Sequence, residues 1–463
     1  MKAVLLIDFG STYTKLTAVD VEAEAVLGTA AAYTTVQTDI NDGLNKGLRL
    51  LEEKIGKVEF SECFACSSAA GGLRMVTSGL VPELTGEAAK LASLGAGAKV
   101  VGIYAFQLTE EDLEEIAKSK PDIFLLVGGT DGGNTECILH NAKMLATLDA
   151  DFPVVVAGNR TAARECEKLL AGKQVYICPN VMPKFGVLNI EPTQKQIREI
   201  FLNRIIQAKG LSKVSDLLSD IMMPTPAAVL QAMELLAQGC EGESGIGELV
   251  AVDVGGATTD VYSIADGMPE HMNTVYKGLP EPYAKRTVEG DIGMRYSIQG
   301  IVDAAGLDEV SRLSGLSPER VGELVEDLKC HTEKVPNGDP ELEKLDYALA
   351  SMAIREAVTR HAGTIEETYT MMGLTYVQSG KNLTNVKQIV VTGGSLIHTK
   401  RTEEIASYAL YSPAQPTSLR PKQADVWVDR TYILAAMGLL SSHYPQTALR
   451  IMKKELEYHG NSK

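Results

Sequence analysis

Two short segments of the chain combine an aspartate, glycine and small hydroxyl residues in nearly the same order. The first is DFGSTYTK at residues 8–15, and the second is DVGGATTD at residues 253–260. Each segment follows one apolar run and precedes another, which predicts a β-hairpin with the glycine in its turn. Backbone N–H groups in such turns point into a concavity and can bind phosphate oxygens. Two copies therefore predict a site for a polyphosphate.

Carboxylates placed beside phosphates repel them unless a divalent cation lies between the two groups. For Asp8 and Asp253 we expect that cation to be Mg²⁺ with several waters retained, so that Mg-ATP is the expected ligand. A third segment, VVTGGS at residues 390–395, predicts a buried strand that ends in a Gly-Gly turn. The missing side chains there would let an adenosine lie against the backbone. One Asp-x-Gly turn alone favours an ordinary hairpin, whereas the three segments together favour a nucleotide site.

The elements that must position these turns alternate along the chain. Short apolar runs predict strands at residues 4–7, 122–127, 153–157, 174–178, 249–254 and 388–392. Amphipathic periodicity predicts helices at residues 110–118, 134–148, 161–170, 193–208 and 227–238. The alternation is typical of an α/β fold in which helices cover a mostly parallel sheet. In the second half we expect a loop around residues 277–293 and a helical region up to residue 373.

A small, polar stretch at residues 240–247 (CEGESGIG) separates the two halves of the chain. We therefore expect a first lobe at residues 1–240, with an α/β insertion at about 60–220, and a second lobe at residues 247–445. Residues 446–463 are predicted to form a C-terminal tail, which is rich in lysine and glutamate from Arg450 onward and ends as a solvated helix.

Composition and charge restrict the class of protein. With 44 basic and 60 acidic residues the net charge is −16, so neither nucleic acid nor a membrane surface is expected as a partner. Seven cysteines are few and odd in number, which suits reduced thiols in a cytosol. The first apolar run ends at Ile7, where it meets Asp8, too early for a signal peptide, and no stretch has the length of a membrane span. We expect a soluble, cytoplasmic protein.

The three motifs, in their order along the chain, resemble those of a known superfamily. IDFGSTYTK, AVDVGGATTDVYSI and VVTGGSLI are similar to the phosphate-1, phosphate-2 and adenosine motifs of the actin, sugar-kinase and heat-shock-chaperone ATPases. The segments that begin at Pro224 and Asp429 are similar to the two connecting helices of that superfamily. The resemblance spans both halves. It implies two actin-like ATPase lobes of the ribonuclease H-like type around a nucleotide cleft.

The resemblance also implies roles for individual residues. Asp8 and Asp253 would be the catalytic residues, holding Mg²⁺ through water, and Asp253 would orient the attacking water. The residues expected to bind ATP or ADP are Gly10, Ser11, Thr12, Lys15, Gly255, Gly256, Thr258, Gly393, Gly394 and Ser395. The expected reaction is hydrolysis of ATP to ADP and phosphate. Ala257 departs from the pattern, because chaperone relatives often place a third glycine there.

Within the superfamily the whole chain resembles the GlmL/MutL proteins, which are accessory ATPases associated with adenosylcobalamin-dependent glutamate mutase. The stretches that support this are residues 66–76, 125–134 and 286–295. The resemblance implies a chaperone-like reactivating factor that promotes release of damaged cobalamin from a mutase. The partner would thus be a protein, and a homo-oligomer is left open.

Two alternatives from other classes stay open. A small-molecule kinase of the acetate and sugar kinase superfamily would need a carboxylate base, for which Asp291 is the candidate. An iron–sulfur, ATP-dependent activator of a 2-hydroxyacyl-CoA dehydratase would need cysteine ligands. Cys137 and Cys166 are the candidates, although the helical patterns around them favour core thiols. Cys63 and Cys66 are likewise expected to be buried and inert.

Overall fold

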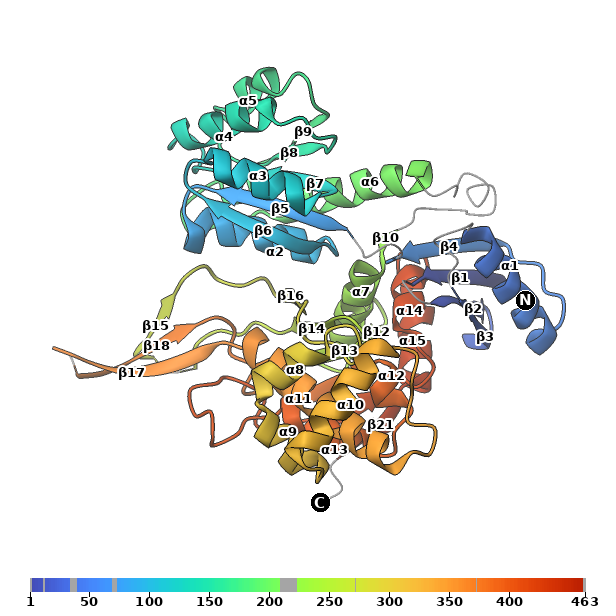
Figure 1. The fold of residues 1–463 in the computed structure, drawn as a ribbon. Coiled ribbons are helices and arrows are strands. Elements are labelled where there is room, and N and C mark those ends of the chain that lie inside the picture. The colour runs from blue at the N-terminus through green and yellow to red at the C-terminus, as the bar shows by residue number, and fades with distance from the viewer. Residues whose placement is uncertain are drawn as a thin grey trace. The chain divides into compact units, whose positions relative to one another are not determined.

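The computed structural model of the chain describes residues 2–10, 13–33, 40–68, 73–208, 223–270, 272–371 and 373–460. It divides into two compact units (Figure 1). Unit 1 comprises Met1–Ala232, Gly278–Pro280 and Leu434–Ile451. Unit 2 comprises Met233–Lys277, Glu281–Ile433 and Met452–Lys463. Each unit is therefore built from segments that lie far apart in the sequence, and the predicted division of the chain near residue 240 stays a prediction.

The first sheet of unit 1 has five strands in the order β10-β4-β1-β2-β3. Its strands are β1 (Ala3–Phe9), β2 (Tyr13–Asp20), β3 (Ala25–Tyr33), β4 (Glu62–Ser67) and β10 (Met223–Pro224). Its helices are α1 (Ile40–Ile55), α7 (Thr225–Gln238), α14 (Leu434–Ser441) and α15 (Pro445–Glu455). Every residue of β1 is buried, because α14 packs against β1 and β4. The apolar run that precedes Asp8 is thus a central strand.

The second sheet of unit 1 is entirely parallel and has the order β6-β5-β7-β8-β9. Its strands are β5 (Arg74–Gly79), β6 (Lys99–Ala105), β7 (Ile123–Leu126), β8 (Val154–Val156) and β9 (Val175–Ile177). Its helices are η1 (Pro82–Gly86), α2 (Glu87–Gly95), α3 (Glu110–Ser119), α4 (Glu136–Thr147), α5 (Ala163–Leu169) and α6 (Glu191–Ala208). This is the inserted α/β layer. It begins only after β4, because β4 pairs in parallel with β1.

The main sheet of unit 2 has six strands in the order β16-β14-β13-β19-β20-β21. Its strands are β13 (Leu249–Val254), β14 (Thr259–Ile264), β16 (Ala284–Glu289), β19 (Gln388–Thr392), β20 (Asp425–Val428) and β21 (Glu457–His459). Its helices are α8 (Ile298–Ala305), α9 (Leu307–Ser314), α10 (Pro318–Cys330), α11 (Pro340–His361), α12 (Gly394–Ile397), α13 (Thr402–Ala406) and η3 (Ser407–Ala409). Two short strands, β11 (Gly239–Cys240) and β12 (Glu243–Ser244), form a small hairpin in the segment predicted to separate the halves.

The same strand order occurs in both units. The series β3-β2-β1-β4-β10 of unit 1 corresponds to β16-β14-β13-β19-β20 of unit 2, with the same strand directions. The fifth strand of each series is followed by a helix: α7 follows β10, and α14 follows β20. The predicted α/β fold with two related, actin-like units is confirmed, and so are the strands and helices listed from the periodicity.

Residues far apart in the chain also determine how closely two helices of unit 1 approach. A Cβ atom added at Gly438 of α14 would lie 1.8 Å from the carbonyl oxygen of Ala228 in α7. Only glycine leaves room for this approach, because any side chain would overlap the backbone of α7. Gly438 therefore sets how the two helices pack.

Some elements differ from those predicted. Strand β16 forms inside the predicted loop, and the predicted helical region ends at His361. Strands β17 (Thr364–Thr370) and β18 (Gly373–Ser379) follow it as a hairpin, and β18 also pairs with β15 (Thr274–Lys277), so that the three strands form a separate sheet. Threonines and Ile365 in β17 are β-branched, which favours a strand.

The segment predicted as a tail continues as α15 and β21, and Ile451 and Met452 are fully buried. Strand β21 pairs with β20, which gives this segment a place in the main sheet of unit 2. Over the described part of the chain, no helix combines the length and the apolar character needed to cross a membrane.

Candidate functional site

The first Asp-x-Gly hairpin is formed by β1 and β2. Asp8 is buried, with 8% of its surface exposed, and pairs across the two strands with Lys15. The N–H group of Gly10 donates to the carbonyl oxygen of Tyr13 at 3.1 Å and closes the turn. A Cβ atom at position 10 would lie 2.6 Å from that same oxygen, so the turn requires glycine. Ser11 and Thr12, which the sequence also predicted for this site, lie outside the described residues.

The second hairpin, between β13 and β14, repeats this geometry. Asp253 pairs with Asp260, as Asp8 pairs with Lys15. The N–H group of Gly255 donates to the carbonyl oxygen of Thr258 at 2.9 Å, and a Cβ atom at position 255 would lie 2.9 Å from that oxygen. The sequence repeat is therefore a repeat of strand register and turn hydrogen bond.

A threonine that the sequence did not single out holds the first aspartate. The hydroxyl of Thr225, the first residue of α7, donates to Oδ1 of Asp8 at 2.6 Å. The Sγ atom of Cys66 donates to the same oxygen at 3.5 Å. Burial, and then the charge of Asp8, raise the pKa of Cys66 well above its usual range, so the thiol stays protonated. Asp8 is thus tied to helix α7 as well as to its own sheet.

The Gly-Gly turn after β19 lies beside the second hairpin. Thr392 pairs with Asp253 in the parallel register of β13 and β19. Gly393 has a φ of 109°, and a Cβ atom there would lie 2.3 Å from the carbonyl oxygen of Val254. The Oγ atom of Ser395 is buried and has no hydrogen-bond partner among the described residues. Only glycine at position 393 permits the close approach to the backbone of Val254. Next to this turn, the hydroxyl of Ser395 is available to a ligand.

Tyr432 is a second residue that sequence reasoning missed. Its φ is 55°, which a tyrosine rarely adopts, and a Cβ atom at Gly394 would lie 3.3 Å from its hydroxyl. Burial, together with the charges of Asp253 and Asp429, raises the pKa of Tyr432 and keeps it protonated. Asp429 itself is buried and accepts a hydrogen bond from the N–H group of Ile433 at 2.9 Å. No local sequence signal distinguishes this tyrosine from others in the chain.

The carbonyl groups of the second turn are bound by the segment that follows β16. The N–H group of Met294 donates to the carbonyl oxygen of Gly255 at 3.0 Å. The N–H groups of Arg295 and Tyr296 donate to the carbonyl oxygen of Gly256 at 2.8 and 2.9 Å. This segment overlaps residues 286–295, which supported the family resemblance. These hydrogen bonds hold the second turn in place through its carbonyl oxygens.

A buried ion pair links the same hairpin to the neighbouring strand. Nε of Arg286 donates to Asp260 at 2.8 Å, and its Nη2 lies 2.5 Å from the same carboxylate. The hydroxyl of Thr258 donates to the other oxygen of Asp260 at 3.5 Å. The pair therefore connects β14 and β16 directly beneath the turn.

The residues at these turns fit Mg-ATP in their chemistry. Asp8 and Asp253 provide hard oxygen donors, the turns admit only glycine at positions 10 and 393, and Ser395 has an unsatisfied hydroxyl. Within the described ranges, no group of three or more His, Cys, Asp or Glu side chains is placed to hold a metal ion. A Mg²⁺ ion held mainly through its waters needs no such group.

The residues of the two alternative functions are engaged elsewhere. Arg360 donates to both oxygens of Asp291, at 2.8 and 3.0 Å. Partial burial raises the pKa of Asp291, but the hydrogen bonds and charge of Arg360 outweigh it and lower the pKa below its usual value. A carboxylate held in this way is a weak general base.

The cysteines considered above, Cys63, Cys66, Cys137 and Cys166, are buried thiols. Sγ of Cys137 donates to the carbonyl oxygen of Phe106 at 3.2 Å, and burial raises its pKa. Burial raises the pKa of Cys166 to about 11 and that of Cys63 to about 12. Thiols in such surroundings resist the deprotonation that metal ligation requires.

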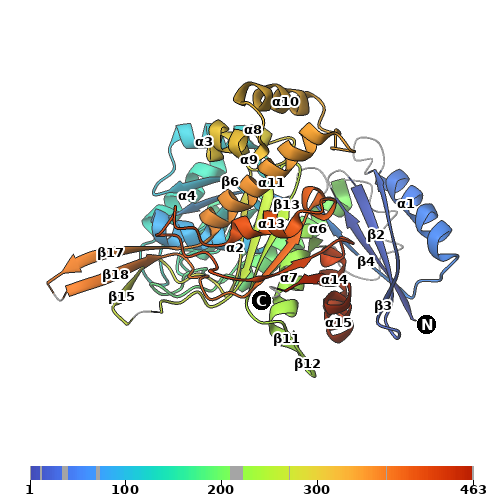
Figure 2. The same cartoon turned by 90° about the horizontal axis from the view of Figure 1, so that it is seen from below.

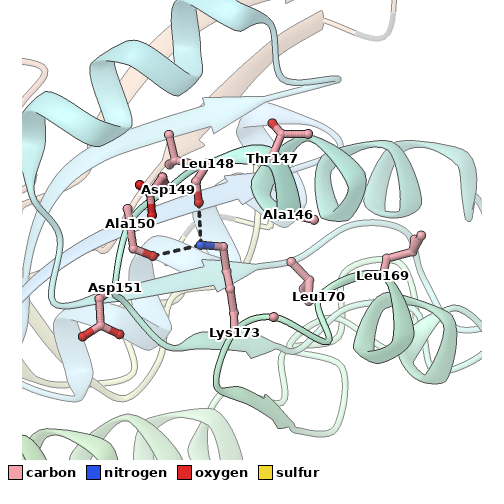
Figure 3. A pocket seen from close by; sticks show the side chains of 10 residues that line it. Ala146, Thr147, Leu148, Asp149, Ala150, Asp151, Leu169, Leu170 and Lys173 are labelled. Carbon is pink, nitrogen blue, oxygen red and sulfur yellow. Dashed lines mark hydrogen bonds between the residues drawn. The ribbon is translucent and has the colours of Figure 1, made fainter.

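A pocket of about 490 Å³ in the inserted layer contains none of the predicted site residues (Figure 3). It is lined by residues 146–151 and by the segment around Lys173. Nζ of Lys173 donates to the carbonyl oxygens of Leu148 and Ala150 at 2.8 and 2.9 Å. The lysine is thus part of the local backbone packing.

The repeated sheet, with an Asp-x-Gly hairpin in each copy, defines a protein of the actin-like ATPase fold. The family described as "MutL protein" matches residues 4–456. The chain is 49% identical over 460 residues to Protein MutL from Clostridium tetanomorphum, covering 98% of this chain and 99% of that relative. The chain therefore belongs to the MutL protein family.

Solved structures with a similar arrangement are distant. Component A of (R)-2-hydroxyglutaryl-CoA dehydratase from Acidaminococcus fermentans is 9% identical, covers 98% of this chain and 99% of its own, and has a TM-score of 0.31. Ligand-bound xylulose kinase from Lactobacillus acidophilus is 10% identical, covers 99% and 93%, and has a TM-score of 0.36. At these scores neither carries an argument, and the fold assignment rests on the strand order of the chain itself.

Proposed function

We propose that the protein binds and hydrolyses Mg-ATP and serves as a reactivating factor for an adenosylcobalamin-dependent mutase of the glutamate mutase type. In this role it promotes release of damaged cobalamin, so that intact cofactor can bind again. The observation that carries the nucleotide part is the duplicated hairpin, with one aspartate and one glycine-closed turn per copy. Membership of the MutL family and the resemblance to GlmL/MutL accessory ATPases support the mutase as partner.

In this proposal Asp8 and Asp253 hold Mg²⁺ through its waters, and Asp253 orients the water that attacks the terminal phosphate. When bound, Mg²⁺ neutralises part of the phosphate charge. The hydrogen bond from Thr225 keeps the carboxylate of Asp8 in one orientation. Such positioning suits phosphoryl transfer, which asks for little covalent chemistry from the protein.

The remaining predicted residues bind the nucleotide. The turns that contain Gly10 and Gly255 offer N–H groups to the phosphates, and Lys15 offers a positive charge next to Asp8. The turn at Gly393 takes the adenosine, where the Oγ atom of Ser395 gains a partner. Remodelling of a mutase further requires that the ATP-bound and ADP-bound states differ in their affinity for it.

The test is phosphate release from Mg-ATP by the purified protein, alone and with a cobalamin-inactivated glutamate mutase. Stimulation of hydrolysis by the mutase supports the whole proposal, and cobalamin exchange is the next assay. Hydrolysis that ignores the mutase contradicts the proposed partner and leaves the ATPase. Absence of hydrolysis in both mixtures contradicts the proposed catalytic role of Asp8 and Asp253.

A further inference from the structure

The sheet formed by β15, β18 and β17 extends from unit 2 as an arm. Figures 1 and 2 both show these strands reaching away from the six-stranded sheet of the same unit. Among the described elements no helix packs extensively on any of its three strands. In β17 every residue except Ile365 is exposed. We call this sheet the β arm.

The end of the arm gathers apolar side chains. Tyr369 pairs with Leu374 across β17 and β18, and opposed residues share a face, so these two lie on one face together with Tyr376. The side chain of Asn273 donates to the carbonyl oxygen of Leu374 at 2.8 Å, which places Met272 beside the turn. We call Met272, Tyr369, Met371, Leu374 and Tyr376 the arm tip.

Three of the five arm-tip side chains are highly exposed, and Leu374 and Tyr376 are partly buried. Met272 and Met371 are fully exposed, and Tyr369 is 84% exposed. A cluster of exposed apolar groups on one element usually marks an interaction surface. Methionine is suited to such a surface, because its flexible thioether adapts to the shape of a groove.

The root of the arm is fixed, in contrast to its tip. Gln378 is buried and donates to the carbonyl oxygens of Gly267 and Gly380, both at 2.9 Å. Nζ of Lys381 donates to those of Pro282 and Tyr283 at 2.6 and 2.7 Å. An anchored root with an exposed tip presents the apolar side chains in a defined direction.

The negative charge of the arm indicates what kind of protein can bind it. Glu366 and Glu367 are exposed on β17 and give the arm negative charge. A second copy of the chain would bring the same two carboxylates and a net charge of −16, so pairing of two arms is opposed. The arm instead fits a different protein, with an apolar groove bordered by basic side chains.

We propose that the arm tip docks into such a groove on the partner protein, which under the proposed function is the cobalamin-dependent mutase. The inference thus rests on that function and assigns its docking element.

The test measures binding of the full-length protein to the glutamate mutase of the same organism, at low and at physiological salt. The apolar variant combines Met272→Ser, Tyr369→Ser and Met371→Ser. Its control combines Phe185→Ser and Val187→Ser, which remove exposed apolar groups from unit 1. We expect the apolar variant to lower the affinity at least tenfold, with unchanged basal ATP hydrolysis and circular dichroism, and the control to bind normally.

A second pair of variants tests the charge. Glu366→Lys with Glu367→Lys should weaken binding most at low salt, because exposed charges act over longer distances there. Glu52→Lys with Glu53→Lys on α1 changes the net charge equally and should bind as the unmodified protein does. If this control also loses affinity, net charge alone explains the effect, and the proposed basic side chains around the partner's groove are refuted.

Each further outcome decides between the two proposals. If the unmodified protein binds the mutase and the arm variants bind equally well, the arm is not the docking element and the proposed function stands. If the unmodified protein does not bind the mutase in any nucleotide state, the proposed function itself fails. Sedimentation could instead show that the unmodified protein forms an oligomer and that the apolar variant does not. That result would identify a second copy of the chain as the partner of the arm tip and overturn the proposal.

Discussion

The hydrogen bond between Thr225 and Asp8 offers a sharp test of the candidate site. Thr225→Val removes the hydroxyl and keeps the shape of the side chain, whereas Thr225→Ser keeps the hydroxyl. The bond is 2.6 Å long, and Asp8 is only 8% exposed, so bulk water has little access to replace the lost donor. Sγ of Cys66, at 3.5 Å, is a weaker donor to the same oxygen.

A hydrogen bond to a charged group contributes about 1.5–3 kcal/mol, and we expect Thr225→Val to lower the free energy of unfolding by about that amount. This corresponds to a roughly ten- to hundredfold change in the folding equilibrium. We expect Thr225→Ser to differ from the unmodified protein by less than about 0.5 kcal/mol. Urea denaturation followed by far-ultraviolet circular dichroism measures the change.

The same variants separate stability from nucleotide binding. If Asp8 holds Mg²⁺ as proposed, its loss of orientation in Thr225→Val should also weaken Mg-ATP binding, measured by calorimetry, while Thr225→Ser restores it. Equal stability and equal Mg-ATP affinity in all three proteins would refute the idea that Thr225 holds the carboxylate in place. A loss of stability with unchanged Mg-ATP affinity would refute only the role of Asp8 at the metal.

Three further predictions concern the site, the helix packing and a buried lysine. Asp253→Ala should abolish phosphate release and leave the circular dichroism unchanged, and normal turnover would contradict the site assignment. Gly438→Ala would place its Cβ 1.8 Å from the oxygen of Ala228, so we expect a loss of at least about 1–3 kcal/mol in urea denaturation, and an unchanged midpoint would show that the helices separate easily. Burial lowers the pKa of Lys381 to about 7. Because the unfolded state then binds more protons between pH 7 and the ordinary lysine pKa, stability should rise with pH there by up to about 1.4 kcal/mol per unit. Lys381→Met should reduce this slope in melting experiments at pH 7 to 9, and an identical slope would refute the assignment.

Short-range features of the molecule could be predicted from the sequence. The hairpins at Asp8 and Asp253 are closed by hydrogen bonds between residues three apart, so eight residues contain all that the turn needs. Strands β7, β8 and β9 of the inserted layer are short apolar runs bounded by glycine, proline or polar residues, and they form where expected, whereas β5 and β6 were not predicted. In both cases the determining contacts, or the pattern that reports them, lie within one local window.

Other features depend on pairing between distant segments. Strands β16 and β18 pair with β14 and β15, which are not their neighbours in sequence. Strand β17 pairs with β18 in a hairpin but has little apolar alternation of its own, so its sequence resembles a helix or loop as much as a strand. Thr225 reaches Asp8 across 217 positions of sequence. The left-handed backbone of Tyr432 likewise has no local sequence signal.

The sequence by itself determined the repeated Asp-x-Gly turns and the alternation of helices and strands. Only the tertiary structure decided which donors hold Asp8, why Gly393 and Gly438 must be glycine, and where the apolar arm tip is exposed. The physical reason is the range of the interactions. Turn geometry and periodicity are set by neighbouring residues, whereas close approach, burial and hydrogen bonding between elements arise only when distant segments pack together.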